Sequence, residues 1–286
     1  ARAFAAEPID VFAGIPPVAY LVERIGGGQV HVELLIHSNQ DPHTFEPTPK
    51  QVQALAKAKV FFKVGMPFED QLIEKIRSTQ PNLEVVDTTQ GIEKLRMSAT
   101  YADDHAQSVV EHSHDGLPTD LDPHVWLSPL LAKKQAANIA AALEKNDPHH
   151  AAFFQANLAR LQQELDAVDT KISLSLKPYA GSTFYVFHPA FGYFADRYHL
   201  KQEAIEAGGR QPSPGQLRRL IQTAKAQNAR VIFVQPQFDR HSPETVAQSI
   251  GGRIVPINDM DKDVIANLQE IASKIAEALK ETHENH

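Results

Sequence analysis

The stretch DPHHAAFFQANLARLQQELDAVDTKISLS, residues 147–175, decides the fold that we expect for this chain. Its apolar residues, such as Phe154, Leu158 and Leu161, recur at helical spacing, and no glycine or proline interrupts it after the second residue. A helix of this length, at ~1.5 Å per residue, is roughly 40 Å long. That exceeds what a crossover within one domain needs, so we expect a rigid helix that joins two domains. A long surface helix of a single domain is the alternative.

Short runs rich in β-branched and aromatic residues alternate with helical patterns on both sides of this stretch. They cover residues 9–14, 31–37, 59–65 and 83–87 before it, and residues 183–187, 230–235 and 253–257 after it. Such alternation is typical of βα units on parallel sheets. We therefore predict an α/β protein with an N-terminal lobe over 1–146, a linking helix over 147–176 and a C-terminal lobe over 177–286.

Composition excludes several classes of function. The chain of 286 residues is 42% hydrophobic and has a net charge of −7 without a long basic run, whereas nucleic-acid binding needs clustered Lys and Arg. No apolar stretch reaches the ~18 residues that a membrane span needs. The chain has no cysteine, which excludes disulfides, thiolate metal sites and cysteine nucleophiles.

The first residues, ARAFAAEPID, place alanines at alternate positions, Ala3 and Ala5, before a polar stretch. This resembles the end of a secretory signal with its cleavage site, and an arbitrary alanine-rich end is the alternative. We expect an exported protein whose signal peptide is removed. The absence of cysteine favours free diffusion over a lipid anchor.

Asp-Pro-His occurs three times, in different surroundings. In NDPHH we expect Asp147 to cap the long helix and the two histidines to lie in its exposed first turn. In DPHTFEPTP and DPHVWLSP the next helix starts later, at a Thr-Pro or Ser-Pro pair, where Thr48 and Ser128 supply the cap. His43 and His124 therefore lie in the loops before the caps.

A third histidine has a similar setting, because His188 follows a predicted strand and precedes Pro189 and an amphipathic pattern. Loops at the carboxyl ends of parallel strands converge on the ligand crevice of open α/β sheets. Imidazole is a good ligand for divalent transition metals. His43, His124 and His188 are therefore candidate ligands of one metal ion, although a histidine in a loop is most often only a surface residue.

Residues 103–122, DDHAQSVVEHSHDGLPTDLD, form a second histidine-rich segment, which is polar and has no clear period. Its histidines, His105, His112 and His114, alternate with acidic residues. Because acidic residues raise the local concentration of cations, we interpret the segment as an accessory loop that collects metal ions. A solvated acidic loop is the alternative.

The motifs DPHTFEPTP, DPHVWLSP, FHPAFGYFA and VIFVQPQFD, with the long central helix, resemble the zinc- and manganese-type periplasmic substrate-binding proteins of bacterial ABC importers, over essentially the whole chain. The resemblance implies two lobes with parallel four-stranded sheets, one rigid helix joining them and a metal ion in the cleft between the lobes. It puts the family's ligands at His43, His124 and His188, and a flexible loop at about 103–120. It also implies a membrane permease as partner, and we expect a monomer that binds no nucleic acid.

The fourth ligand departs from the family's pattern. Many relatives have an aspartate in the loop after the last strand, where this chain has Asn258, with Asp259 beside it. We expect the fourth ligand to be Asp259, after a small loop shift, or a water molecule. The carbonyl oxygen of Asn258 is the third alternative. Relatives of the manganese type offer a glutamate where this chain has His188, and some relatives have a glutamate in place of Gln235.

Three imidazoles and at most one oxygen favour tetrahedral zinc, because manganese prefers more oxygen ligands. We therefore expect Zn²⁺, with Mn²⁺ or another divalent transition metal as alternatives, and a protein that captures and delivers the ion without catalysis. A metal-dependent adhesin, a zinc buffer and a zinc hydrolase or lyase are the rival functions. Catalysis needs a base beside metal-bound water. Glu46 is the nearest candidate in sequence, and we expect it instead to hold the loop or support a ligand from outside the coordination sphere.

Overall fold

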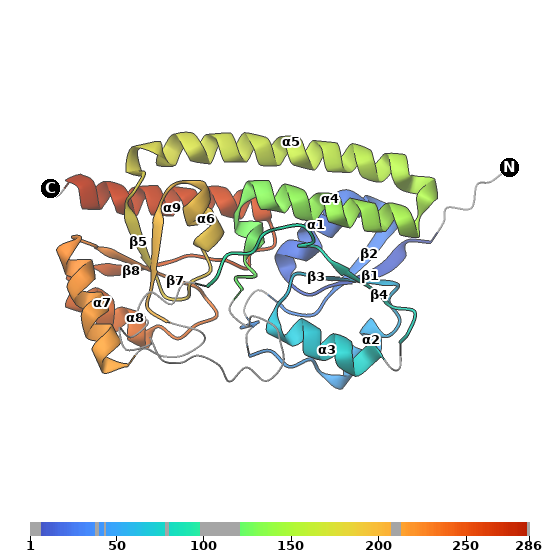
Figure 1. Cartoon of the computed structure of the whole chain (residues 1–286), viewed down its shortest axis with the longest axis horizontal. Coiled ribbons are helices and arrows are strands. Elements are labelled where there is room, and N and C mark those ends of the chain that lie inside the picture. The colour runs from blue at the N-terminus through green and yellow to red at the C-terminus, as the bar shows by residue number, and fades with distance from the viewer. Residues whose placement is uncertain are drawn as a thin grey trace. The chain divides into compact units, whose positions relative to one another are not determined.

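The chain folds as two compact units, each with its own sheet (Figure 1). The computed structural model describes residues 7–37, 40–42, 44–77, 80–97, 121–206 and 213–284. The first unit comprises Ala1–Ile92, Val125–Ile172 and Met260–Glu270. The second unit comprises Glu93–His124, Ser173–Asp259 and Ile271–His286.

The first unit contains a parallel sheet of four strands in the order β2-β1-β3-β4. The strands are β1 (Ile9–Ala13), β2 (Val30–Leu34), β3 (Val60–Lys63) and β4 (Glu84–Asp87). The helices of this unit are α1 (Pro16–Gly26), α2 (Pro49–Leu55), α3 (Pro67–Arg77) and α4 (Pro129–Asn146). Helix α1 packs against β2 and α4, and Figure 1 shows α4 on one side of the sheet with α2 and α3 on the other. Because helices cover both faces, central strand β3 is fully buried at Val60, Phe61 and Phe62.

The second unit repeats this plan with a parallel sheet in the order β6-β5-β7-β8. Its strands are β5 (Thr183–Val186), β6 (Lys201–Ala204), β7 (Val231–Val234) and β8 (Arg253–Pro256). Its shorter helices are α6 (Gly192–Arg197), α7 (Pro214–Ala226) and α8 (His241–Ser249). The core on one side of the sheet joins Tyr185 and Ile232 to Leu220 of α7 and Val246 of α8. Two parallel four-stranded sheets confirm the predicted fold class.

The long helix α5 (Ala151–Leu176) has 26 residues. It confirms the helix that the spacing of apolar residues predicted, and Phe154, Leu161 and Leu165 from that pattern are fully buried. Residues of α5 as far as Ile172 belong to the first unit, and its last four residues belong to the second. Helix α9 (Val264–Glu284) also contributes residues to both units, whereas the sequence predicted a single linking helix. The amphipathic pattern of α9 shows which residues are buried but does not indicate which unit each turn belongs to.

The predicted starts of α2 and α4 are correct in position, but only that of α2 has the expected capping hydrogen bond. Thr48 caps α2 through its side chain and forms a capping box with Gln51. Ser128 occupies the cap position of α4 without a hydrogen bond from its side chain to the helix. Asp147 likewise makes no side-chain cap, and a short 3-10 turn over Pro148–His150 precedes α5. The α-helix therefore starts three residues later than the NDPHH motif predicted.

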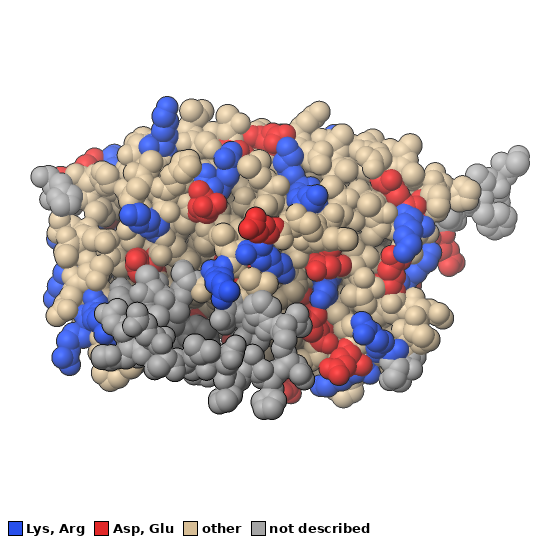
Figure 2. Space-filling view, viewed as in Figure 1, with Lys and Arg blue, Asp and Glu red and all other residues tan. Residues whose placement is uncertain are grey.

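None of the helices in the described ranges combines the length and the apolar character needed to cross a membrane. On the face of the molecule drawn in Figure 2, positive and negative side chains are interspersed, without a large area of one sign among the coloured residues. That distribution agrees with the mixed charge of the sequence.

Candidate functional site

Four buried polar side chains follow the four strands of the second sheet, each at the carboxyl end of its strand. They are His188 after β5, Glu206 after β6, Gln235 after β7 and Asp259 after β8. Parallel strands end at the same edge of a sheet, and this is the edge where open α/β sheets bind ligands. Burial of such groups costs free energy unless they are hydrogen-bonded or bind a ligand. This edge of the second unit is therefore the candidate functional site.

His188 is held on both sides of its backbone and at its ring. Glu206 Oε2 lies 2.6 Å from Nδ1 of His188, and the two side chains are 5% and 2% exposed. Gln235 accepts a hydrogen bond from the backbone N–H of His188 at 3.3 Å and donates one to its carbonyl oxygen at 2.8 Å. The ring of Phe238 lies 5.0 Å from that of His188, centroid to centroid. These contacts fix the position of the imidazole and the orientation of its ring.

His124 is held in the same manner by the aspartate of its own Asp-Pro-His motif. Oδ1 of Asp122 lies 2.7 Å from Nδ1 of His124 and accepts the backbone N–H of His124 at 2.9 Å. The side chains of Asp122 and His124 are 2% and 1% exposed. The hydroxyl of Tyr193 in α6 donates to the backbone carbonyl of Asp122 at 2.8 Å, which ties this loop to the second unit.

The two predicted ligands His124 and His188 come together, with ring centroids 5.3 Å apart and an angle of 70° between the rings. A carboxylate can only accept, so each ring donates from Nδ1–H and carries its lone pair on Nε2. Histidines that bind metals have this arrangement, because a carboxylate fixes the tautomer and makes the other nitrogen more basic. The pair is therefore suited to bind a divalent transition metal through Nε2.

Asp259, the predicted fourth ligand, is 1% exposed and follows β8 at the same edge of the sheet. The side-chain amide of Gln237 donates from Nε2 to Oδ1 of Asp259 at 2.9 Å. Asn258, the alternative, is partly buried. The structure therefore puts a buried carboxylate, already oriented by a hydrogen bond, at the end of the strand where the fourth ligand was expected.

The other predicted site residues are less well defined. His43 lies outside the described residues, as do the accessory histidines His105, His112 and His114. Glu46 is exposed, and its predicted role beside His43 stays a prediction. Within the described ranges, no three His, Asp or Glu side chains come together in an arrangement that would hold a metal ion. The complete ligand set therefore stays a prediction.

The segment that follows His43 is nevertheless tied to the first unit. The ring of Phe45 meets the ring of Phe68 edge to face, with centroids 5.2 Å apart. Phe68 is in the first turn of α3, beside Glu69. The loop that carries the third predicted ligand is thus packed against the start of α3.

Glu69 is a fully buried carboxylate in this first turn of α3. Its oxygens accept the backbone N–H groups of Val64, Gly65 and Met66 at 2.6–3.2 Å. Burial raises its pKa to about 7, while these hydrogen bonds and the charge of Lys63 act in the opposite direction. Gly14 leaves room for the carboxylate, because a Cβ at that position would lie 2.1 Å from Oε1 of Glu69. The group holds the loop between β3 and α3.

The histidines of NDPHH differ from each other. His149 is exposed, as predicted. His150 is only 31% exposed, because its Nδ1 lies 2.5 Å from the carboxylate of Asp147 and its ring lies 6.4 Å from that of Phe154. The prediction that both are solvated is therefore wrong for His150, which braces the start of α5.

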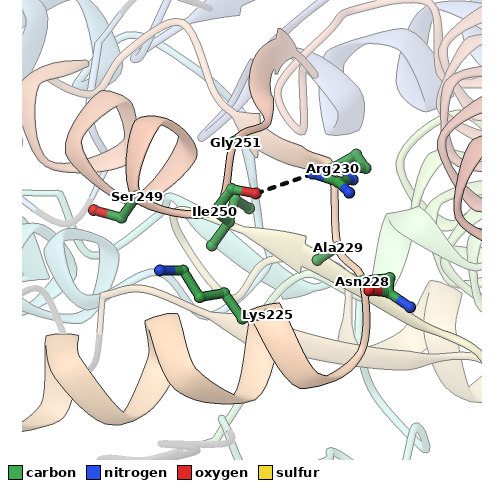
Figure 3. Close-up of a pocket in the computed structure, with 7 residues that line it drawn as sticks. All are labelled: Lys225, Asn228, Ala229, Arg230, Ser249, Ile250 and Gly251. Carbon is green, nitrogen blue, oxygen red and sulfur yellow. Dashed lines mark hydrogen bonds between the residues drawn. The ribbon is translucent and has the colours of Figure 1, made fainter.

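A pocket of about 360 Å³ lies at the other end of the second sheet, where β7 and β8 begin (Figure 3). Arg230 donates to the backbone carbonyl of Ile250 across it at 3.3 Å, and Lys225 extends into it from the last turn of α7. Basic side chains at the carboxyl ends of helices commonly offset the partial negative charge there. Arg230 thus binds the carbonyl at the carboxyl end of α8, and the pocket lies at the edge opposite to His188.

Sequence reasoning missed three residues that organise the site: Asp122, Glu206 and Gln237. Asp122 carries a local signal, since it precedes His124 by two residues in the same Asp-Pro-His motif. Glu206 has no local signal, because it lies beside His188 only through the pairing of β5 with β6. Strand β6 was itself missed, since its polar sequence KQEA resembles a loop. Gln237 reaches Asp259 only through the pairing of β7 with β8.

Comparison with known proteins gives matches over nearly the whole chain. The family described as "Zinc-uptake complex component A periplasmic" matches residues 11–282. The high-affinity zinc uptake system protein ZnuA of Bacillus subtilis is 30% identical over 258 residues, which cover 89% of this chain and 79% of that protein. A crystal structure of ZnuA is similar to this chain with a TM-score of 0.85 at 36% identity, over 95% of this chain and 99% of that one.

A more distant structural relative is the laminin binding protein Lmb of Streptococcus agalactiae, described as a bifunctional protein with adhesin and metal transporting activity. It has a TM-score of 0.80 at 22% identity and covers 95% of this chain and 99% of its own. Similarity at that level supports the fold alone. The family match over residues 11–282, by contrast, includes all but the first two residues of the two sheets and all the residues described at the site, and the chain belongs to the family of the periplasmic zinc-uptake complex component A.

Proposed function

We propose that this chain captures one zinc ion with high affinity in the periplasm and delivers it to the membrane permease of an ABC importer. The observation that carries the proposal is the pair of buried histidines, His124 and His188, with rings 5.3 Å apart and a carboxylate behind each ring. A carboxylate that fixes the tautomer and orientation of an imidazole is the usual outer partner of a metal-binding histidine. Membership of the zinc-uptake family supports zinc as that ligand.

His43, His124 and His188 are the proposed nitrogen ligands, and Asp259 is the proposed oxygen ligand. Asp259 is favoured over Asn258 because its carboxylate is buried and already oriented by Gln237. A set of three imidazoles and one carboxylate oxygen has the donors and the coordination number of tetrahedral zinc. Manganese is the weaker candidate, because the set has few oxygen donors and nitrogen ligands favour zinc in the affinity order.

The protein binds and releases its ion without bond chemistry. A zinc hydrolase would need a base beside the metal-bound water. Glu46, the candidate base by sequence, is exposed and at the surface of the first unit. We further propose that the protein acts as a monomer, that its signal peptide is removed on export, and that the segment with His105, His112 and His114 collects metal ions for the main site.

Zinc affinity, measured by competition with a chromogenic chelator, tests the proposal. His188→Ala and His124→Ala should each weaken zinc binding by more than the ~10–100-fold typical of losing an outer partner of a ligand. His149→Ala is the matched control, because His149 is exposed in the turn before α5 and should leave the affinity unchanged. Equal affinities in wild type and His188→Ala would exclude this site.

Delivery requires a separate experiment in cells that lack their own zinc-uptake binding protein. The chain, expressed behind a signal peptide for export and together with its cognate permease, should restore growth when a chelator limits zinc. His188→Ala should not restore growth, and His149→Ala should. Restored growth with His188→Ala would contradict delivery through this site.

A further inference from the structure

The side-chain amide of Gln237 donates a hydrogen bond to Asp259, a predicted metal ligand, while its own oxygen has no hydrogen-bond donor among the described residues. It lies in the loop after β7, and its Nε2 donates to Oδ1 of Asp259 at 2.9 Å. Its carbonyl oxygen Oε1 is buried, and no hydrogen-bond donor in the described part of the chain reaches it.

The orientation of this amide follows from its partner. An ionised carboxylate only accepts hydrogen bonds, so the NH₂ group of Gln237 has to face Asp259. Oε1 then faces away from the carboxylate, into a buried position without a donor. A buried carbonyl oxygen without a partner costs free energy, and such an atom in a native protein calls for a ligand or water to satisfy it.

The neighbours of Gln237 point to the same ligand. Gln235, two residues earlier, holds the backbone of His188 with two hydrogen bonds. Phe238, the next residue, packs on the ring of His188. One short loop therefore contacts His188 on one side and Asp259 on the other, and the unsatisfied oxygen belongs to the residue between these contacts.

We propose that Gln237 is a further residue of the metal site, whose Oε1 donates an electron pair to the bound cation or to a water molecule that the cation carries. Its Nε2–H at the same time orients the carboxylate of Asp259. The inference rests on the proposed function, because it takes His188 and Asp259 as ligands of the ion.

Gln237→Met tests the inference, because methionine has a similar length without the amide's donor and acceptor. Zinc affinity should fall about 10–100-fold. Gln248→Met is the matched control, since Gln248 is exposed on α8 and should leave the affinity unchanged. The melting temperature of the zinc-free variant should stay close to that of wild type, which separates a role toward zinc from a purely structural role.

X-ray absorption at the zinc edge of the loaded protein distinguishes the two forms of contact. Loss of one nitrogen or oxygen atom bound to zinc in Gln237→Met would show that Oε1 binds the metal itself. An unchanged number of bound atoms, together with weaker affinity, would show that it acts through water. If Gln237→Met does not fold, Gln237→Asn, which keeps the amide but shortens its reach, is judged by the same measurements.

Unchanged affinity and an unchanged zinc environment in Gln237→Met would overturn the inference while His188→Ala still loses zinc. The proposed function would then stand. If instead wild type and His188→Ala bind zinc equally, or neither binds, the proposed function fails and this inference fails with it.

Discussion

The imidazole rings of His124 and His188 lie with their centroids 5.3 Å apart, and each ring donates from Nδ1 to a buried carboxylate. The two carboxylates come from different sources. Asp122 belongs to the same loop as its histidine, whereas Glu206 lies just after the neighbouring strand β6. The two histidines should therefore respond differently when their carboxylates are changed.

Glu206→Gln should weaken zinc binding about 10–100-fold, because the neutral amide supports Nδ1–H of His188 less strongly than the carboxylate does. Chelator competition measures the change. Glu244→Gln is the control, because Glu244 is exposed and pairs only loosely with Arg240 at 3.7 Å. An affinity of Glu206→Gln equal to that of wild type would show that Glu206 does not support the ligand.

Asp122→Ala should weaken zinc binding and also lower the free energy of unfolding, because Asp122 accepts both the ring N–H and the backbone N–H of His124. Leaving a buried donor without a partner costs about 1–3 kcal/mol. Asp122→Asn keeps an acceptor oxygen, so it should lose affinity with a smaller loss of stability. Denaturation by urea, combined with chelator competition, separates the two effects. Equal stability losses in both variants would contradict this assignment.

Much of the fold could be predicted because its signals are local. The apolar spacing of α5 and the alternation of strands and helices identified two α/β units, since both patterns are visible in short windows. Strand β6 escaped because KQEA has no apolar run, and only its pairing with β5 makes it a strand. The double role of α9 escaped because an amphipathic pattern does not specify the partner that covers it.

The residues of the candidate site likewise divide into those with a local sequence signal and those without one. His124 and His188 could be predicted, because each lies in a loop and is followed within five residues by a proline that signals the next helix or turn. Their partners in space could not all be found by sequence, because the contact of Glu206 with His188 depends on which strand lies next to β5. The unsatisfied oxygen of Gln237 depends on three-dimensional burial, for which the sequence has no signal.

The capping boxes provide a test of local stability. Thr48→Ala at the start of α2 and Ser213→Ala at the start of α7 should each lower the free energy of unfolding by about 1 kcal/mol, because each side chain accepts a backbone N–H of its helix. Ser128→Ala should cost less, since Ser128 makes no such bond to α4. Urea denaturation measures all three. A larger loss for Ser128→Ala than for Thr48→Ala would contradict the capping geometry.

Glu69 should make the stability of the zinc-free protein depend on pH. Burial raises the pKa of Glu69 from 4.5 to about 7, against hydrogen bonds from Met66, Gly65 and Val64 and the charge of Lys63. Lys63 in turn pairs with Asp70 and also faces Asp87. Between the two pKa values the unfolded chain has lost the proton that the folded protein still holds. The contribution of Glu69 is therefore present below pH 4.5 and is lost as the pH rises to about 7.

A shift of this size corresponds to about 3 kcal/mol of stability lost between those pH values. Glu69→Gln cannot titrate, so its free energy of unfolding should fall less than that of wild type over the same interval. Urea denaturation at both ends of the interval measures the difference. Glu74→Gln is the control, because Glu74 is exposed on the same helix and should keep the wild-type slope. Identical slopes for wild type and Glu69→Gln would mean that Glu69 stays ionised in the folded protein throughout the interval, stabilised by the three backbone N–H groups against its burial.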